Sequence, residues 1–169
     1  MPLAALGFSV LALCLENGAS AERGRGRAFW AAFFFAYGYF VAGMYWTGIS
    51  FLVDARRFAV LLPLPVLGLP LLLALFPALG VWGVQGWLGQ ALNGGRWLLP
   101  IRLALGWSVG EQVRSHILTG LPWNLVGYVW TFSDAMIQPA AWIGAQGLSL
   151  LTVMLLAAPA LLIDRKSVV

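Results

Sequence analysis

The sequence predicts an all-α, multi-pass integral membrane helical bundle with about five transmembrane helices. Of its 169 residues, 61% are hydrophobic and only 9% are charged, while aromatic residues reach 14%. A soluble domain carries about 25% charged residues, so this chain has too few polar side chains to cover a surface that faces water. A disordered chain is also excluded, because disorder requires much charge and few aromatic residues.

Uncharged runs of the sequence locate the helices, because a helix needs about 20 apolar residues to cross a bilayer core of about 30 Å. We expect five helices, over residues 2–15, 28–51, 70–92, 97–119 and 139–163. The third belongs to the long uncharged run 58–95, whose first part contains Pro63, Pro65 and Pro70. Proline removes a helical hydrogen bond, so we expect an irregular entry before this helix.

The distribution of basic residues predicts the orientation of the chain, because short cytoplasmic loops collect Lys and Arg. Alternate loops hold seven of the basic residues: Arg23, Arg25, Arg27, Arg96, Arg102, Arg165 and Lys166. The other side holds three: Arg56, Arg57 and Arg114. The loops 16–27 and 93–102 and the C-terminus are therefore expected in the cytoplasm, and the segments 54–62 and 118–138 outside.

Single features of the sequence argue against several other classes of protein. The one cysteine, Cys14, excludes a disulfide framework, and we interpret it as a small apolar residue within a helix. No Lys or Arg precedes the first apolar run, so a signal peptide is not expected. The net charge of +4 comes without a basic patch that contains aromatic residues, so no nucleic-acid partner is predicted. His116 is the only histidine, so neither a metal site nor a cofactor is expected.

The fourth expected helix carries the charged residues that could have a function. Trp107, Glu111, Arg114 and Leu118 are spaced to share one helix face. Ionisable groups are costly in lipid, so Glu111 and Arg114 should face the bundle interior, as a pair. They could clamp helices together, Arg114 could extend to the interface, or both could contact a lipid head group.

The segment after this helix predicts a sharp turn followed by an aromatic surface. Gly120 permits a change of direction, and Pro122 disfavours helical geometry in the residue before it. Trp123 and Tyr128 follow, and such rings are typical of the membrane–water interface. The segment is therefore either a simple aromatic belt or a lipid-facing portal that guides an acyl chain.

Three motifs resemble the membrane region of bacterial apolipoprotein N-acyltransferases. The most specific is Trp107-x3-Glu111-x2-Arg114-x4-Thr119-Gly120-Leu121-Pro122-Trp123-x4-Tyr128. The other two are Gly43-Met44-Tyr45-Trp46-x2-Gly48-Ile49-Ser50 and Trp142-Ile143-Gly144-Ala145-Gln146-Gly147-Leu148-Ser149. The resemblance spans most of the chain, since the motifs extend from residue 43 to residue 149.

The resemblance implies an enzyme of the bacterial inner membrane with eight transmembrane helices and a large periplasmic nitrilase-like domain. Such enzymes transfer an acyl chain from a phospholipid to the amino group of the diacylglyceryl-cysteine of a lipoprotein. The transfer passes through a thioester on the cysteine of a Glu-Lys-Cys triad.

This chain departs from that pattern, since the first helix of the family, the helix after residue 166, the nitrilase-like domain and the last helix are expected to be absent. Cys14 is expected within a membrane helix and Lys166 near the cytoplasmic C-terminus, so these two residues cannot form the family's periplasmic catalytic pair. We therefore expect anchoring and lipid docking without catalysis, with the lipoprotein reached only through the missing domain. The expected lipid-docking residues, including the two that shape the turn, are Glu111, Arg114, Gly120, Pro122, Trp123 and Tyr128.

Two alternatives remain open at this point. In a small transporter or channel-like bundle, Glu111 and Arg114 would line a polar path across the bilayer. In a structural membrane subunit, the glycines that recur every third residue from Gly80 to Gly89 would bind a partner helix.

Overall fold

The computed structural model describes residues 2–16, 22–87, 95–117, 120 and 122–163, and the secondary structure of this part is helical, without strands. The five long helices are α1 (Pro2–Glu16), α2 (Glu22–Met44), α4 (Leu69–Trp87), α5 (Leu99–His116) and α7 (Ala140–Ala157). The short elements are η1 (Tyr45–Leu52), α3 (Ala55–Phe58), η2 (Ala59–Leu61), η3 (Leu64–Gly68), η4 (Arg96–Leu98), η5 (Val126–Trp130), α6 (Asp134–Ile137) and η6 (Ala158–Leu161). The predicted all-α architecture is confirmed.

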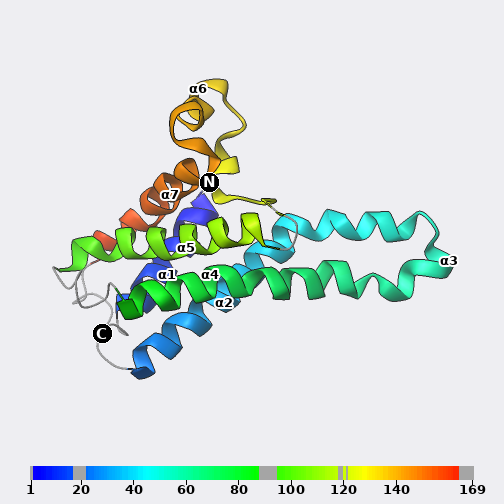
Figure 1. Cartoon of the computed structure of the whole chain (residues 1–169), viewed down its shortest axis with the longest axis horizontal. Helices are drawn as coiled ribbons and strands as arrows, with labels where there is room; N and C mark the ends of the chain where they lie inside the picture. The colour runs from blue at the N-terminus through cyan, green and yellow to red at the C-terminus, as the bar shows by residue number, and fades with distance from the viewer. Residues whose placement is uncertain (1, 17–21, 88–94, 118–119, 121, 164–169) are drawn as a thin grey trace.

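The long helices form a closed bundle, in which α4 lies between α2 and α5, and α5 packs on α7 (Figure 1). Helix α1 completes the bundle through contacts with α7, α2 and α5. The start of α2, the end of α4 and the start of α5 lie together at one end, which we call the basic end (Figure 1). The opposite end, where α5 finishes, is called the loop end.

Three stretches of the described chain are long and apolar enough to cross a membrane: Gly24–Leu52, Arg56–Trp87 and Ala140–Leu161. The apolar part of α1, Ala4–Leu15, is shorter. Helix α5 carries three charged residues, but Arg102, Glu111 and Arg114 are only 6%, 1% and 0% exposed. The charges of α5 therefore point into the bundle and away from lipid, as the cost of burying charge in hydrocarbon predicts.

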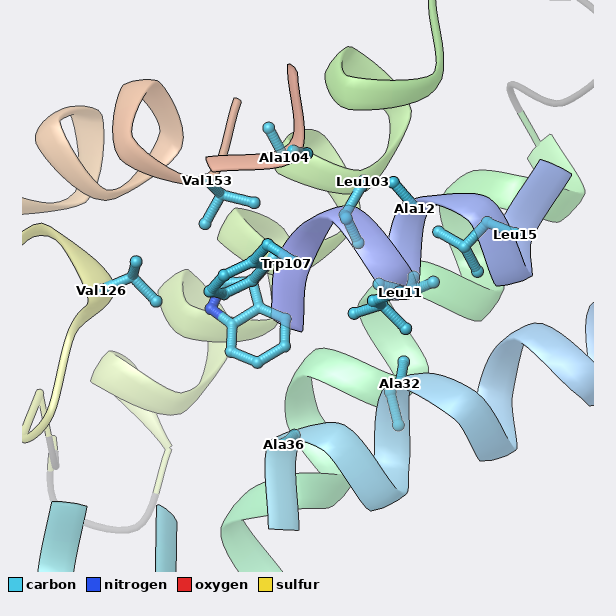
Figure 2. Close-up of a cluster of buried hydrophobic side chains, with 14 of the residues drawn as sticks. Leu11, Ala12, Leu15, Ala32, Ala36, Leu103, Ala104, Trp107, Val126 and Val153 are labelled. Atoms are coloured by element: carbon cyan, nitrogen blue, oxygen red, sulfur yellow. The ribbon is translucent and has the colours of Figure 1, made fainter. Parts of the chain in front are cut away.

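The core is built around Trp107 of α5, which is fully buried. Its ring makes edge-to-face contacts with Phe8, Phe35 and Tyr39, at centroid distances of 5.0, 5.7 and 5.9 Å. Figure 2 shows this indole among aliphatic side chains from other helices, with Val153 on one side. One large ring thus joins α1, α2 and α5, and edge-to-face geometry is favourable for such pairs.

Helices α4 and α5 cross closely because both carry glycine at the contact. A Cβ added at Gly106 would lie 2.6 Å from the Cα of Val81, and one at Gly110 would lie 2.6 Å from the Cα of Pro77. Gly80 lies against the same part of α5, so this member of the glycine stripe packs within the chain rather than on a partner. Gly83 has open space around it, and Gly89 lies outside the described residues.

The structure differs from the sequence prediction at the start of α2. This helix begins at Glu22 rather than at residue 28, so Arg25 and Arg27 belong to its first turns instead of a loop. Arginine is a good helix former, and the Arg25 guanidinium is covered by the ring of Trp82. A charged residue can therefore extend a transmembrane helix when the bundle covers its head group.

The segment before α4 is irregular, as its prolines predicted. The π-helical segment η3 precedes α4, while α2 and η1 run alongside to form a long hairpin with α3 near its tip (Figure 1). At about 1.5 Å per residue, the stretch Arg56–Trp87 is about 48 Å long, more than the roughly 30 Å of a hydrocarbon core. The tip, which holds an Asp54–Arg57 ion pair of 3.8 Å, extends past the loop end.

Candidate functional site: a loop held over one end of the bundle

The candidate site is the segment 122–130, which folds back over the loop end of the bundle. Helix α5 ends at His116, and the chain turns at Gly120, whose φ of +73° places it in the left-handed region. A Cβ there would also lie 2.9 Å from the carbonyl oxygen of Ser115, so the turn requires glycine. Asn124 has a φ of +54°, a second left-handed residue that keeps the segment compact.

Glu111 fixes the middle of this segment from inside the bundle. Its Oε1 accepts hydrogen bonds from the Trp107 Nε1–H and the Val126 backbone N–H, both at 3.1 Å. One carboxylate oxygen therefore joins the core tryptophan to the loop. Because both donors are buried with it, Glu111 satisfies groups that would otherwise be costly to leave unpaired.

Arg114 holds the start of the segment. Its Nη1 donates to the carbonyl oxygen of Trp123 at 2.6 Å, and its guanidinium lies 5.1 Å from the centroid of the Phe40 ring. The expected pairing with Glu111 is present as a longer-range electrostatic attraction, since no ion pair within 4.0 Å joins these two described side chains. Each bonds instead to a different part of the same loop backbone, so both act as loop anchors.

Neighbouring helices supply further anchors that the sequence did not reveal. From α2, the Tyr39 hydroxyl donates to the carbonyl oxygen of Asn124 at 3.1 Å. From α7, the Ser149 hydroxyl accepts from the Gly127 N–H at 2.8 Å. In the other direction, the Trp130 Nε1–H donates to the Thr152 hydroxyl at 2.8 Å. The segment is thus bonded to α2, α5 and α7.

The outward-facing part of the segment is aromatic. Trp123 and Tyr128 are 46% and 44% exposed, and the ring of Trp123 lies 5.9 Å from that of Trp46 on η1. A cavity of about 300 Å³ opens beside them, bounded by α1, α2, the loop and α7, with Tyr39, Asn124 and Tyr128 as its polar lining. Its other walls are apolar, so the cavity suits a ligand that has one polar group and a greasy body.

The six residues predicted from sequence fall into three groups. Glu111 and Arg114 are buried anchors, Gly120 and Pro122 belong to the turn, and only Trp123 and Tyr128 are exposed. Sequence reasoning missed Tyr39 and Ser149, which lie on other helices. In the sequence, each is marked only as a polar residue within an apolar run, and this pattern does not indicate which group it bonds to.

The described residues contain no group of three or more His, Cys, Asp or Glu side chains that could hold a metal ion. The His116 Nδ1 lies 2.8 Å from the carbonyl oxygen of Gln112 in its own helix. Cys14 is exposed on α1, and Lys166 lies outside the described residues. The described part of the site combines exposed aromatic rings with hydrogen-bonding groups and contains no evident nucleophile.

Comparisons with known proteins show the family to which this chain belongs. Residues 1–158 match the family model "Apolipoprotein N-acyltransferase N-terminal domain". The chain is 44% identical over 156 residues to the apolipoprotein N-acyltransferase of Rhodopseudomonas palustris, covering 91% of this chain and 28% of that protein. It is 46% identical over 128 residues to that of Brucella suis, covering 76% of this chain and 23% of the relative. For the protein of Rhizobium etli the identity is 41%, with 92% and 29% covered.

The chain therefore spans less than a third of the length of these relatives. No solved structure matches it.

Proposed function

Because the chain belongs to the apolipoprotein N-acyltransferase family, we propose that it is the membrane-embedded, lipid-docking part of such an enzyme. The reaction would move an acyl chain from a phospholipid to the amino-terminal diacylglyceryl-cysteine of a lipoprotein. The role of this chain would be to anchor the enzyme in the bacterial inner membrane and to present the phospholipid at the loop end.

One observation carries this proposal: an aromatic loop is fixed rigidly beside an amphipathic cavity. Glu111 and Arg114 hold the loop backbone, so that the rings of Trp123 and Tyr128 keep their positions at the end of the bundle. An acyl chain could lie along these rings and in the apolar part of the cavity, while the side-chain amide of Asn124 could donate a hydrogen bond to an ester oxygen. Preorganised rings reduce the ordering cost of binding.

The orientation proposed with this role follows the positive-inside rule, with the basic end and the C-terminus in the cytoplasm. The loop end and the hairpin tip would then face outside. This is the side on which the family resemblance expects the nitrilase-like domain to work.

We attribute the bond chemistry to a part of the enzyme outside these 169 residues. The relatives are more than three times as long as the region they share with this chain. Cys14 belongs to α1 and has no contact with the loop among the described interactions, and Lys166 lies outside the described residues. This assignment makes the chain inactive by itself.

The transporter alternative receives less support from the geometry. The Oε1 of Glu111 and the Nη1 of Arg114 bond to the loop backbone rather than lining a path. Between them and Arg102, the other charged residue of α5, the side chains of that helix are apolar or small. A continuous polar row is therefore absent from α5.

The test measures acyl-enzyme formation from phospholipid in a full-length relative whose tryptophan corresponding to Trp123 is changed to Ala. We expect about a tenfold loss, because a ring that contacts substrate contributes on the order of 1–2 kcal/mol. The matched control changes the tryptophan corresponding to Trp142, which is exposed but lies on α7 beyond the loop. The 169-residue chain in the same assay should give no acyl-enzyme.

Normal acyl-enzyme formation by the folded Trp123→Ala variant would leave only an aromatic belt at this position. Equal losses in both variants would also contradict a specific docking site. Turnover by the 169-residue chain above a protein-free blank would refute the separation of docking from chemistry.

A further inference from the structure

A second polar cluster lies at the basic end, where α2 begins and α4 ends. The guanidinium of Arg25 on α2 stacks over the ring of Trp82 on α4, 4.4 Å from its centroid. Gly86, one turn further along α4, leaves the space that this guanidinium occupies, because a Cβ there would overlap its nitrogen atoms. A stacked arginine keeps its N–H edges available to an acceptor that lies in the plane of the group.

The chain does not supply that acceptor within its described part. The Nε of Arg25 is buried and has no hydrogen-bond partner there, and no described carboxylate lies within 4.0 Å of the guanidinium. Arg96 at the same end differs, since its Nη2 donates to the carbonyl oxygens of Ala160 and Ile163 at 3.1 and 2.6 Å. Arg96 thus secures a helix end, while Arg25 is held in position without a hydrogen-bond acceptor among the described residues.

A buried amide lies at the same level of the bundle. Gln85 is 6% exposed, and neither its Oε1 nor its Nε2 has a partner among the described residues. Native structures rarely leave such a group unpaired, so a water molecule or a ligand is expected to complete it.

The register of the helices places Arg102 beside this amide. Helices α4 and α5 are antiparallel and bring Val81 against Gly106 and Pro77 against Gly110. One further turn in this register sets Gln85 level with Arg102, which is also 6% exposed. Two arginines, one from α2 and one from α5, therefore flank the unpaired amide.

The charge balance of the whole sequence favours an anion at this end. The seven basic residues assigned to the cytoplasmic side are accompanied by three acidic ones, Glu16, Glu22 and Asp164. The other side has three basic and three acidic residues, the latter being Asp54, Glu111 and Asp134. The net charge of +4 is thus concentrated on one side of the membrane, and basic pockets between transmembrane helices attract anionic head groups there.

We propose that Arg25, Gln85 and Arg102, with Trp82 as a stacking wall, form a binding site for the phosphate of an anionic lipid in the leaflet at the basic end. The planar guanidinium of Arg25 matches two phosphate oxygens, and the Gln85 amide adds a donor. The ring of Trp82 is half-exposed, so it can also pack on the adjoining acyl chains. This site is separate from the loop end and does not depend on the proposed function.

The experiment titrates the 169-residue chain in neutral detergent with short-chain phosphatidylglycerol and reads the bound fraction by native mass spectrometry. Arg25→Gln removes the stacked charge, and Gly86→Ala displaces the guanidinium without changing any charge. Each should weaken phosphatidylglycerol binding about tenfold, the size expected for the loss of one charge-assisted contact. Circular dichroism melting of each variant confirms that it is folded.

Two control variants are matched to these changes. Arg27→Gln removes the same charge two residues along α2 from an exposed side chain, and Gly83→Ala adds the same methyl group where nothing lies within 4 Å. Both should bind like the parent chain. If Arg25→Gln and Arg27→Gln weaken phosphatidylglycerol binding equally, the effect comes from net charge alone and the proposed site is wrong. Unchanged binding by Gly86→Ala would also contradict the site.

A further arm identifies the source of the phosphate. Inorganic phosphate at millimolar concentration should not displace phosphatidylglycerol, because the acyl chains contribute to lipid binding. If inorganic phosphate displaces phosphatidylglycerol from the parent chain but not from Gly86→Ala, the site binds phosphate as a free anion. That result would overturn the assignment to a lipid. Equal affinity of the parent chain for phosphatidylglycerol and for zwitterionic phosphatidylcholine would overturn the anionic selectivity.

Discussion

The two ends of the bundle bury similar groups but use them differently. At the loop end, Arg114 and Glu111 bond to backbone and indole groups of the same chain. At the basic end, the Nε of the partly buried Arg25 and both amide atoms of the buried Gln85 have no hydrogen-bond partner among the described residues. The difference teaches that burial alone does not define the role of a polar group in a membrane bundle. A group whose partner is in the chain fixes structure, while one without such a partner is available to a ligand.

The largest effect is expected when the side chain of Glu111, which anchors the loop, is removed. Glu111→Ala should lower the free energy of unfolding by about 3–5 kcal/mol, because it leaves the Trp107 indole N–H and the Val126 N–H buried without an acceptor and opens a cavity. Thermal unfolding in detergent measures the loss. In Glu111→Gln the amide oxygen still accepts from both donors, so a loss of about 1 kcal/mol or less is expected. Similar losses for the two variants would show that the hydrogen bonds are not what matters at this position.

An intermediate effect is expected at the glycine crossing that lies between the two ends. Gly106→Ala places a methyl group 2.6 Å from the Cα of Val81, so α4 and α5 must move apart, at a cost of about 1–3 kcal/mol. Because both ends depend on this register, loop anchoring and lipid retention at the basic end should weaken together. Gly83→Ala on the open side of α4 is the control, with an expected change within about 0.5 kcal/mol. An unchanged free energy of unfolding in Gly106→Ala would mean that α4 and α5 lie further apart at this crossing than in the structure.

The smallest effect on stability is expected at Gln85, at the basic end of the bundle. Gln85→Leu replaces an unpaired buried amide by an apolar group of similar size, so stability should stay within about 0.5 kcal/mol or rise. The same change should weaken phosphatidylglycerol binding, which separates ligand binding from folding at this residue. A loss of stability approaching that of Glu111→Ala would place Gln85 among the structural anchors instead. Unfolding is measured in the absence of added lipid, so that bound ligand does not contribute.

Several features of the fold could be predicted because they follow from composition and local spacing. Long uncharged runs predict helices wherever the solvent is hydrocarbon, and the prolines before α4 predict an irregular segment, which the structure has as η3. The interior position of Glu111 and Arg114 follows from the cost of exposing charge to lipid. The start of α2 was placed too late, because the loop prediction treated every arginine as water-facing. Arg25 stacks on a tryptophan that lies 57 residues later in the chain, which no local pattern can indicate.

The candidate site was predictable only in part for the same reason. The spacing of Trp107, Glu111 and Arg114 specifies a shared helix face, but it does not specify what that face meets. An ion pair between neighbours on one helix was the natural expectation, yet the structure gives each side chain a backbone partner in the loop. Tyr39 and Ser149 could not be assigned at all, because their partners lie on a segment more than 20 residues away.

The sequence by itself determined that this is a membrane protein, where its apolar runs lie, that its basic residues gather in alternate loops, and which family it resembles. These are sums and short-range patterns, and the free energy of transferring a residue into hydrocarbon depends mainly on the residue itself. Only the tertiary structure decided which polar groups satisfy one another, since a hydrogen bond depends on distance and direction between atoms brought together by helix packing. The loop anchored by Glu111 and Arg114, and the arginine and amide without described partners at the other end, are outcomes of that packing.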